Sequence, residues 1–346
     1  MKKQCLKCIL ATIAVLLLVP VRAVAEPPVY GDIDLSRRVT IADVTLLIDH
    51  LLSGETTIID DVNGDLRVSI QDVTVLIDYL LSGSLVLDLY SPPVPDSALV
   101  ITVNGVSFAM MPVEGGEYDY QPPTNVTVTL SDYYMGMTEV TMELWEAVMG
   151  SRPVTGTLYK VKPNQPADWL SWWMCQEFIG RLNELTGLEF HLPTWDQWRY
   201  AAIGGKWTHR YTYAGSEDVD EVAWYNGNRP ELFERFVQLY NSSPFYTMPV
   251  GMKKPNELGL YDMSGNMMEW LEDANPGRGE ELRPLDPDQP YMSHVTVLKG
   301  GSMEQGSSQC NVYRPLGNVY LSDYPVSIYP DAGFRLVLQA SSLSNR

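Results

Sequence analysis

A duplicated segment near the start of the chain constrains its fold more than any other feature. One copy, DIDLSRRVTIADVTLLIDHLLSG, begins at Asp32, and a second, DVNGDLRVSIQDVTVLIDYLLSG, begins 29 residues later at Asp61. The copies share a Val-Ser/Thr-Ile run, an Asp-Val-Thr run and a closing Leu-Leu-Ser-Gly at matching places. This internal repeat indicates two copies of one structural unit.

Oxygen-bearing side chains recur in both copies at the spacing of a calcium-binding loop. A hard cation needs several oxygen atoms that converge on one point, and such a loop supplies them from positions 1, 3, 5, 7, 9 and 12. Position 7 contributes a backbone carbonyl, so an arginine at that position is compatible with binding. The predicted ligands are Asp32, Asp34, Ser36, Arg38, Thr40 and Asp43 in the first loop, and Asp61, Asn63, Asp65, Arg67, Ser69 and Asp72 in the second.

The two loops depart from the usual pattern at position 6, where Arg37 and Leu66 replace a glycine. Acid-rich turns between amphipathic helices, without metal, are the alternative, but a duplicated ligand pattern is hard to obtain by chance. An apolar helical stretch follows each loop, over residues 44–52 and 73–81, and Gly54 or Gly83 then marks its end.

A pair of calcium loops, each followed by one helix, resembles the type I dockerin module with its two F-hand repeats, over residues 30–84. The resemblance implies a small all-α domain that folds with calcium and binds tightly to a cohesin domain on a scaffold or cell-surface protein. In that family, loop positions 10 and 11 and the following helix set partner choice. The residues at positions 10 and 11 here are Ile41, Ala42, Ile70 and Gln71.

The first 25 residues have the pattern of a secretory signal peptide. A basic start is followed by an apolar run over residues 9–19 and by the small residues Ala23 and Ala25. We therefore expect cleavage after Ala25 and a soluble exported protein that is secreted, periplasmic or associated with the cell surface. The alternative is a retained membrane anchor, for which the apolar run is too short to span a bilayer comfortably.

The formal net charge of −19 argues against nucleic acid or an anionic membrane as partner, and it suits a protein that binds calcium. After removal of the first 25 residues, Cys175 and Cys310 remain. One disulfide between them stays open at this point, but a scaffold built on disulfides is excluded.

The rest of the chain predicts a larger domain behind a short linker. The linker is expected over residues 85–98, where SLVLDLYSPPVP contains a proline pair that favours an extended spacer. Strand-like runs such as ALVITVNGVSFAMMPV and NVTVTLSDYYMG are followed by short helices and many turns, so we expect an α+β domain over residues 99–340. One helix start is well marked, because Thr194 can cap it and Gln197 can reach back to the cap.

Several motifs of this domain resemble the formylglycine-generating enzyme, or sulfatase-modifying factor, family in their order and near spacing. They are MPVEGGEY, MGMTEVTMELWEAVMG, HLPTWDQWRYAAIGG, PVGMKKPNELGLYDMSGNMMEW, KGGS and AGFRLVL. The resemblance implies a C-type-lectin-like fold with little regular secondary structure and with bound calcium. Active members oxidise a sulfatase cysteine to formylglycine, using oxygen and copper held by two cysteines.

The family's calcium site matches the segment YDMSGNMMEW. The resemblance assigns carboxylate ligands to Asp262 and Glu269, and backbone carbonyl ligands to Met263, Gly265 and Met267. Two carboxylates around a glycine-containing bend can offer oxygen ligands to a hard cation. The alternative is a carboxylate pair that only caps and salt-bridges the turn. Met268 stands where active relatives carry tryptophan.

The catalytic positions of the family are only partly kept. Ser302 matches the active-site serine and Cys310 matches one catalytic cysteine, but Gln305 occupies the position of the other. Two thiolates can hold a cuprous ion, whereas an amide is a poor substitute, so we expect no copper centre. Cys175 matches a structural cysteine whose partner position holds Leu336, and we expect a buried free thiol there.

These features support three hypotheses. The first is an interaction protein, in which a dockerin delivers a lectin-like domain that binds a glycan or a protein within a polysaccharide-degrading assembly. The second is an oxidase that modifies exported sulfatases, and the third is an enzyme of other chemistry in the same groove. Other catalytic patterns are sparse, since His50, His191, His209 and His294 show no metal-binding spacing.

Overall fold

The computed structural model describes residues 31–36, 38–83, 87, 89–119, 127–153, 162–240, 247–273, 295–314, 318–320 and 328–343. The predicted signal peptide, Arg37 and His294 lie outside these residues. Within them, no helix has both the length and the apolar character needed to cross a bilayer.

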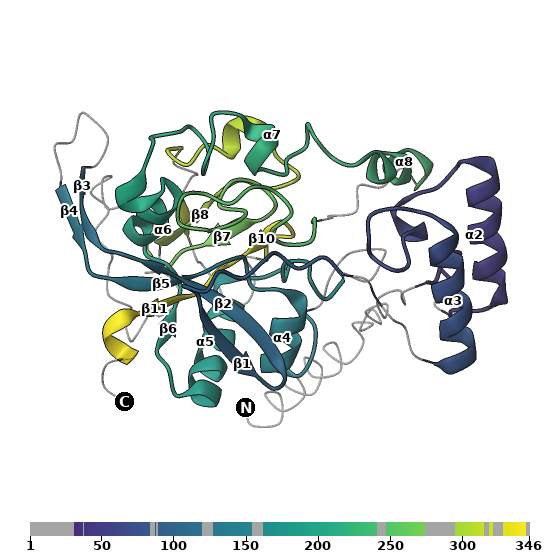
Figure 1. Ribbon diagram of the computed structural model, residues 1–346, viewed down its shortest axis with the longest axis horizontal. Helices are drawn as coiled ribbons and strands as arrows, with labels where there is room; N and C mark the ends of the chain where they lie inside the picture. The colour runs from purple at the N-terminus through teal and green to yellow at the C-terminus, as the bar shows by residue number, and fades with distance from the viewer. Residues whose placement is uncertain are drawn as a thin grey trace, which may run out of the picture.

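The repeat forms a pair of helices, α2 (Ile41–Ser53) and α3 (Ile70–Ser82), at one end of the molecule (Figure 1). Their apolar faces meet in a small core, which contains Ile33, Val44, Leu47, Val62, Val73 and Leu76. Both helices end at a glycine in the left-handed conformation, as predicted. They begin three residues before the apolar stretches, because Thr40 and Ser69 cap the first turns with their side chains.

The larger domain is built on a five-stranded sheet with the order β1-β2-β5-β11-β6. The strand pairs of this sheet are antiparallel, and the C-terminal strand β11 lies between β5 and β6. The strands that sequence alternation predicted are therefore present, but chain order alone does not give their neighbours. Their bounds are β1 Leu99–Val103, β2 Val106–Val113, β5 Tyr133–Gly136, β6 Phe190–His191 and β11 Val337–Gln339.

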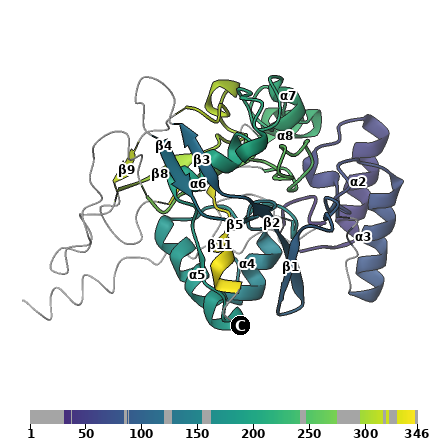
Figure 2. The same ribbon diagram turned by 60° about the vertical axis from the view of Figure 1, so that its left-hand side comes forward.

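Both faces of this sheet are covered. Helices α4 (Met142–Met149) and α5 (Trp172–Thr186) lie side by side on one face, and α6 (Trp195–Ala202) lies on the other (Figures 1 and 2). Neighbouring residues of one strand divide between the two cores: Leu338 packs with α4 and α5, whereas Val337 packs with α6. This is the alternation expected of a strand that is buried on both sides. The predicted capping box of Thr194 and Gln197 starts α6.

A second sheet, with the order β10-β7-β8-β9, carries the motif segments of the C-terminal half. The pair β7 and β10 is parallel, and this pairing brings the segment around residue 268 beside the segment around residue 332. A hairpin of β3 and β4 projects at the far end. The bounds are β3 Gly116–Asp119, β4 Thr127–Leu130, β7 Met268–Trp270, β8 Val295–Lys299, β9 Asn318–Tyr320 and β10 Ala332–Gly333.

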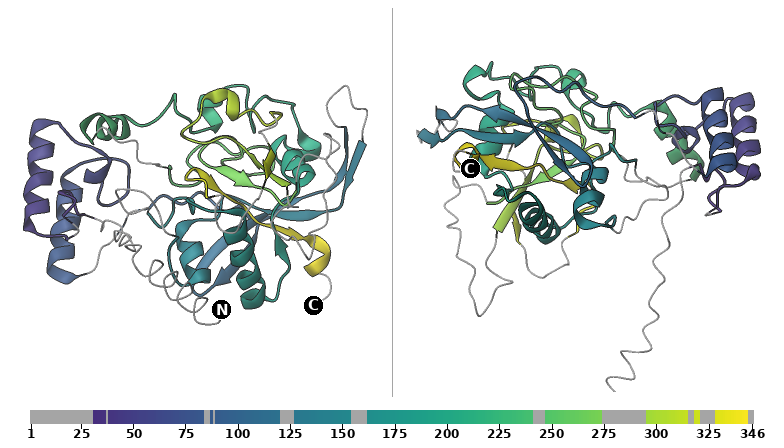
Figure 3. Two further views of the ribbon diagram at one scale, coloured as in Figure 1. Left: turned by 180° about the vertical axis from the view of Figure 1, so that it is seen from behind. Right: turned by 60° about the horizontal axis from the view of Figure 1, so that its bottom comes forward.

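The remaining helical elements are short connectors, apart from α8. Helix α8 (Glu231–Tyr240) lies between the larger domain and the repeat, against the turn η1 (Ile58–Asp60), and Figure 3 shows this arrangement from two further sides. The others are η2 Gly205–Trp207, α7 Val219–Val222, η4 Ser307–Gln309 and η5 Ala340–Leu343. The observed mixture of helices and sheets confirms the predicted α+β class.

Candidate functional site

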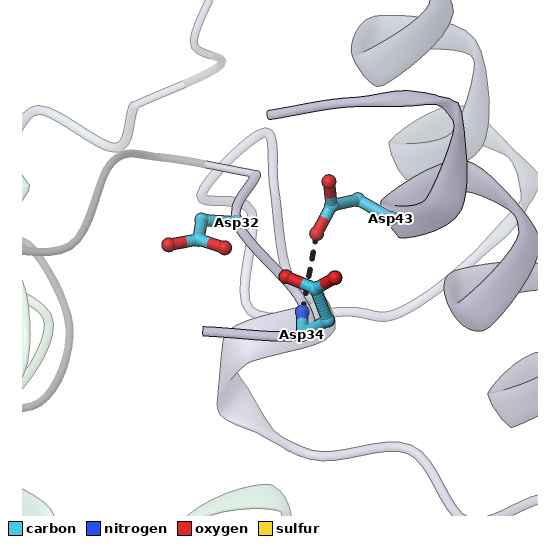
Figure 4. A group of neighbouring side chains, drawn as sticks. All are labelled: Asp32, Asp34 and Asp43. Carbon is cyan, nitrogen blue, oxygen red and sulfur yellow. Dashed lines mark hydrogen bonds between the residues drawn. The ribbon is translucent and has the colours of Figure 1, made fainter. Parts of the chain in front are cut away.

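The first calcium loop brings three predicted ligands together. The carboxylate oxygens of Asp32, Asp34 and Asp43 lie within 4.8 Å of one another, where the loop meets the start of α2 (Figure 4). Asp43 is fully buried, and its Oδ1 accepts a hydrogen bond from the Asp34 amide at 3.1 Å. Hydrogen bonds from the Ser36 side chain and amide lower the pKa of Asp34, which favours its charged form. This donor set fits a hard divalent cation.

The other predicted ligands of the first loop hold its shape. The backbone amide of Ser36 donates to Asp32 Oδ1 at 2.8 Å, and the Ser36 hydroxyl donates to the carbonyl of Arg38 at 3.2 Å. Thr40 donates from its amide to Asp43 Oδ2 at 2.7 Å. Position 9 and position 12 are therefore also the N-cap and the third residue of α2, so one short segment starts the helix and presents oxygen atoms.

The second loop repeats the hydrogen bonds that end on the position-12 carboxylate. Asp72 Oδ1 accepts from the amides of Val62 and Asn63, and Asp72 Oδ2 accepts from the amide of Ser69 at 2.8 Å. Asp61 Oδ1 accepts from the amide of Gly64 at 2.9 Å. Burial raises the pKa of Asp72. The side chains of Asn63 and Asp65 accept from the amides of Asp65 and Arg67, which completes the turn.

The unusual residue at position 6 of the second loop adopts the conformation that glycine would provide. Leu66 has φ of 65°, a strained value for a bulky side chain. Its side chain packs against a cluster formed by Ile58, Phe233 and Met303. Contacts with the larger domain therefore offset the backbone strain.

The segment predicted as a calcium site of the larger domain is buried, and its main carboxylate already has a cationic partner. Arg335 donates from Nη2 to Glu269 Oε1 at 2.6 Å and from Nε to Glu269 Oε2 at 2.8 Å, with both side chains fully buried. The indole of Trp198 donates to the same Oε2 at 2.7 Å. These contacts supply the salt bridge that the alternative expected, and a calcium ion at Glu269 would have to share that carboxylate with Arg335.

Asp262 is the other carboxylate of that segment. Its Oδ2 accepts from the amide of Gly251 at 2.6 Å, and its Oδ1 has no hydrogen-bond partner in the described part of the chain. Burial raises the pKa of Asp262 to about 6. The remaining predicted ligands, the carbonyls of Met263, Gly265 and Met267, belong to the same buried bend. The calcium site of the larger domain therefore stays a prediction.

Glu139 is a member of this buried group that the sequence did not single out. Its Oε1 accepts from the amide of Met267, and its Oε2 accepts from the side chain of Asn266, both at 3.2 Å. Burial, together with the charges of Asp262 and Glu269, raises the pKa of Glu139 well above its usual range. In the sequence, the only sign that Glu139 belongs to this buried group was its place in the family motif MGMTEVT.

The loop that carries the family's catalytic positions is buried at its two ends, while Gln305 between them is half-buried. The Ser302 hydroxyl donates to Asp331 Oδ2 at 2.8 Å, and Ser302 is fully buried. Gly301 has φ of 77°, and a Cβ on it would lie 2.9 Å from the amide nitrogen of Cys310, so only glycine allows the two ends of this loop to meet. Ser302 and Cys310 therefore lie in one closed turn.

Cys310 is a buried free thiol. Burial raises its pKa to about 12, so without a metal the neutral thiol is the favoured form at neutral pH. The side-chain amide of Gln305 donates to the sulfur of Met268 at 3.2 Å. Cys175 is also buried and free, as predicted, and the disulfide that the sequence left open is not formed.

Comparisons with known proteins agree with this organisation. Residues 30–81 match the dockerin type I domain, and residues 91–340 match the sulfatase-modifying factor enzyme 1-like domain. The chain is 32% identical over 203 residues to the chaperone protein LppX of Paenibacillus barcinonensis, covering 48% of this chain and 71% of that protein. It is 30% identical over 206 residues to the formylglycine-generating enzyme of Streptomyces coelicolor, covering 58% of this chain and 60% of that enzyme.

The solved structure of Treponema denticola variable protein 1 has a similar fold. The TM-score is 0.53 at 25% sequence identity, and the match covers 71% of this chain and all of that protein. The predicted C-type-lectin-like fold of the larger domain is confirmed. This chain belongs to the sulfatase-modifying factor enzyme 1-like family, and a type I dockerin domain precedes its family domain.

Proposed function

We propose that this chain is an exported adaptor, whose dockerin binds a cohesin domain in the presence of calcium and thereby presents the larger domain on a scaffold or cell-surface complex. The observation that carries the proposal is a duplicated apolar surface on the dockerin. Ile41 and Ile70 are each 69% exposed, and Leu52 and Leu81 are each 82% exposed. Large apolar side chains at matching places on both helices indicate a contact surface for another protein.

The converging carboxylates of the first loop support the calcium requirement. In this proposal, Asp32, Asp34 and Asp43 would hold calcium at the N-terminal end of α2, and the metal would fix the loop that carries Ile41. Calcium therefore acts by ordering the apolar surface rather than by contacting the partner. The second loop would do the same for Ile70.

The larger domain would act as a ligand-binding or accessory module without oxidase activity. Three features support this part: Gln305 occupies one cysteine position, Cys310 is buried, and Met268 rather than tryptophan lies against Gln305. We place the complex in polysaccharide degradation, with a glycan or a protein as ligand, because dockerins are most often carried by proteins of such assemblies.

The alternative function is a formylglycine-generating oxidase that acts on exported sulfatases. Family membership, the similarity to the Streptomyces coelicolor enzyme and the shared turn of Ser302 and Cys310 favour it. One experiment separates the two functions: a peptide with the sulfatase Cys-x-Pro-x-Arg motif is incubated with the calcium-loaded and copper-loaded chain, and mass spectrometry follows its cysteine. An unchanged peptide cysteine supports the adaptor function. Conversion of that cysteine to formylglycine would support the oxidase function instead.

The docking part needs its own measurement. The purified chain is titrated into cohesin domains of its own genome by calorimetry, first with calcium and then with an excess of chelator. We expect binding to one or more cohesins with calcium and none with chelator. No binding to any cohesin in calcium would refute the docking part, whatever the larger domain does.

A further inference from the structure

The dockerin and the larger domain contact each other through the segment that leads into the second calcium loop. Ile58 is buried in a cluster with Phe233, Met248 and Met303 of the larger domain. Arg235 of α8 donates to the carbonyl of Gly54 at 3.0 Å, and α8 lies beside the repeat in Figures 1 and 3. A change in the second loop therefore affects the contact between the dockerin and the larger domain.

A lysine of the larger domain reaches into the second loop at this contact. The Nζ of Lys162 donates to Asp61 Oδ2 at 2.6 Å and to the backbone carbonyl of Asp61 at 3.0 Å. Lys162 is 6% exposed and Asp61 is 2% exposed. Asp61 is position 1 of the second loop, so a buried ammonium group lies on a predicted calcium ligand.

The two loops differ in how their carboxylates are arranged. Each has three of them, Asp32, Asp34 and Asp43 in the first loop and Asp61, Asp65 and Asp72 in the second. Those of the first loop stand at positions 1, 3 and 12 and converge within 4.8 Å. Those of the second stand at positions 1, 5 and 12, because Asn63 occupies position 3, and among the described residues they form no such group. In the second loop, Asp61 Oδ2 is directed at Lys162.

Calcium and the Lys162 ammonium cannot both make close contact with Asp61 without cost. The two cations repel each other, and burial weakens the screening that solvent and salt would provide at the surface. A buried ammonium also depends on its carboxylate partner, since an unpaired buried charge is strongly disfavoured. Calcium binding in the second loop therefore competes with the contact between Lys162 and Asp61.

We propose that Lys162 is an internal competitor of calcium at the second loop, so that calcium binding there displaces the Lys162 ammonium and loosens the contact between the dockerin and the larger domain. The proposal rests on calcium binding by the dockerin, which is part of the proposed function. In low calcium, Lys162 holds the second loop against the larger domain. In high calcium, the metal replaces it and frees the dockerin for its partner.

Calcium titration by calorimetry tests the competition directly. An Asp34→Ala background weakens the first loop through an exposed side chain, so that the second loop dominates the titration. In this background we compare the native Lys162 with Lys162→Met, which removes the charge, and with Lys162→Arg, which keeps it. Lys206→Met is the matched control, because Lys206 pairs with Glu114 elsewhere in the larger domain.

We expect Lys162→Met to raise the calcium affinity of the second loop by about tenfold or more, since one nearby unit charge is removed from a buried site. Lys162→Arg and Lys206→Met should leave the affinity within about twofold of the native value. The proposal is overturned if Lys162→Met also leaves the calcium affinity of the second loop within about twofold of the native value.

A second measurement uses the unsubstituted chain and does not depend on how the variants fold. Lysines are acylated with an amine reagent at low and at saturating calcium, and mass spectrometry compares Lys162 with Lys206. Calcium should raise the modification rate of Lys162 alone, and continued protection of Lys162 with both loops loaded would refute the displacement. If neither loop binds calcium, the docking function and this inference are refuted together. If only the first loop binds calcium, in the native chain and in both Lys162 variants, this inference alone is refuted.

Discussion

The side-chain amide of Gln305 lies 3.2 Å from the thioether sulfur of Met268, and it donates a hydrogen bond to that sulfur. By the resemblance of the motifs, these are two positions at which the chain is expected to depart from active formylglycine-generating enzymes. The two residues contact each other, so a neutral pair of an amide and a thioether occupies the positions that the resemblance assigns to a thiolate and an indole. A soft cuprous ion would find one buried thiol, that of Cys310, in place of two.

Restoring the cysteine should restore copper binding. We expect Gln305→Cys to raise the affinity for cuprous ion by about tenfold or more, since a second thiol joins Cys310 in the same turn. Competition with a cuprous chelator measures the affinity. Gln309→Cys is the matched control, since it adds a thiol to the same loop at another position. Equal copper binding by the unsubstituted chain and by Gln305→Cys would mean that Cys310 works with a different ligand.

Removing Arg335 should destabilise the larger domain strongly. Arg335→Met leaves the fully buried Glu269 without its cationic partner, and we expect a loss of about 3–5 kcal/mol in the free energy of unfolding. Chemical denaturation measures this free energy of unfolding. Arg181→Met, which breaks an exposed pair with Glu177, should cost less than about 1 kcal/mol.

The same variant tests the predicted calcium site of the larger domain. If Glu269 pairs only with Arg335, calcium should stabilise Arg335→Met no more than it stabilises the unsubstituted chain. Extra stabilisation of the variant would support Glu269 as a calcium ligand.

The duplicated surface of the dockerin predicts a difference between single and double replacement. Ile41→Ser alone leaves the matching surface around Ile70, so we expect cohesin affinity to fall less than about tenfold. Ile41→Ser with Ile70→Ser should lower it about 100-fold or more, as expected when buried apolar anchors of an interface are lost. Calorimetry with a cohesin that binds the native chain measures both. Lys206→Met, in the larger domain, should bind normally. A full loss from Ile41→Ser alone would contradict two equivalent surfaces.

Asp168 predicts a pH-dependent contribution to stability. It is 1% exposed, its Oδ1 has no hydrogen-bond partner among the described residues, and burial raises its pKa to about 8. The folded state therefore keeps a proton that the unfolded state loses above its ordinary pKa. Between about pH 5 and pH 8 the unfolded state binds fewer protons, so this group lowers the stability as the pH rises.

Asp168→Asn should remove the loss of stability that the Asp168 carboxyl causes as the pH rises. We expect its free energy of unfolding to exceed that of the unsubstituted chain by about 1–3 kcal/mol at pH 8, and by less at pH 5. Denaturation across this pH range measures the difference. Asp96→Asn, at an exposed carboxylate, should show no such trend, and a constant difference for Asp168→Asn would contradict the raised pKa.

The sequence by itself determined the local structure of the chain. The loop spacing and the closing glycines predicted both dockerin helices, because a left-handed stop acts within a few residues. The side-chain caps at Thr40 and Ser69, which start each helix three residues earlier than expected, appeared only in the structure. Strand alternation predicted β1 and β2, and the capping box at Thr194 predicted α6. Motif order indicated the family and assigned family positions to Ser302 and Cys310, whereas the closed turn that holds them appeared only in the structure.

Tertiary structure decided which groups neutralise one another. Lys162 pairs with Asp61 across 101 residues, and Arg335 pairs with Glu269 across 66. Neither pairing leaves a local pattern, because a buried charge takes whichever opposite charge the packing of distant elements brings within reach. For the same reason, sequence spacing could present Asp61 and Glu269 as calcium ligands, while only the fold could supply the lysine and the arginine that hold them.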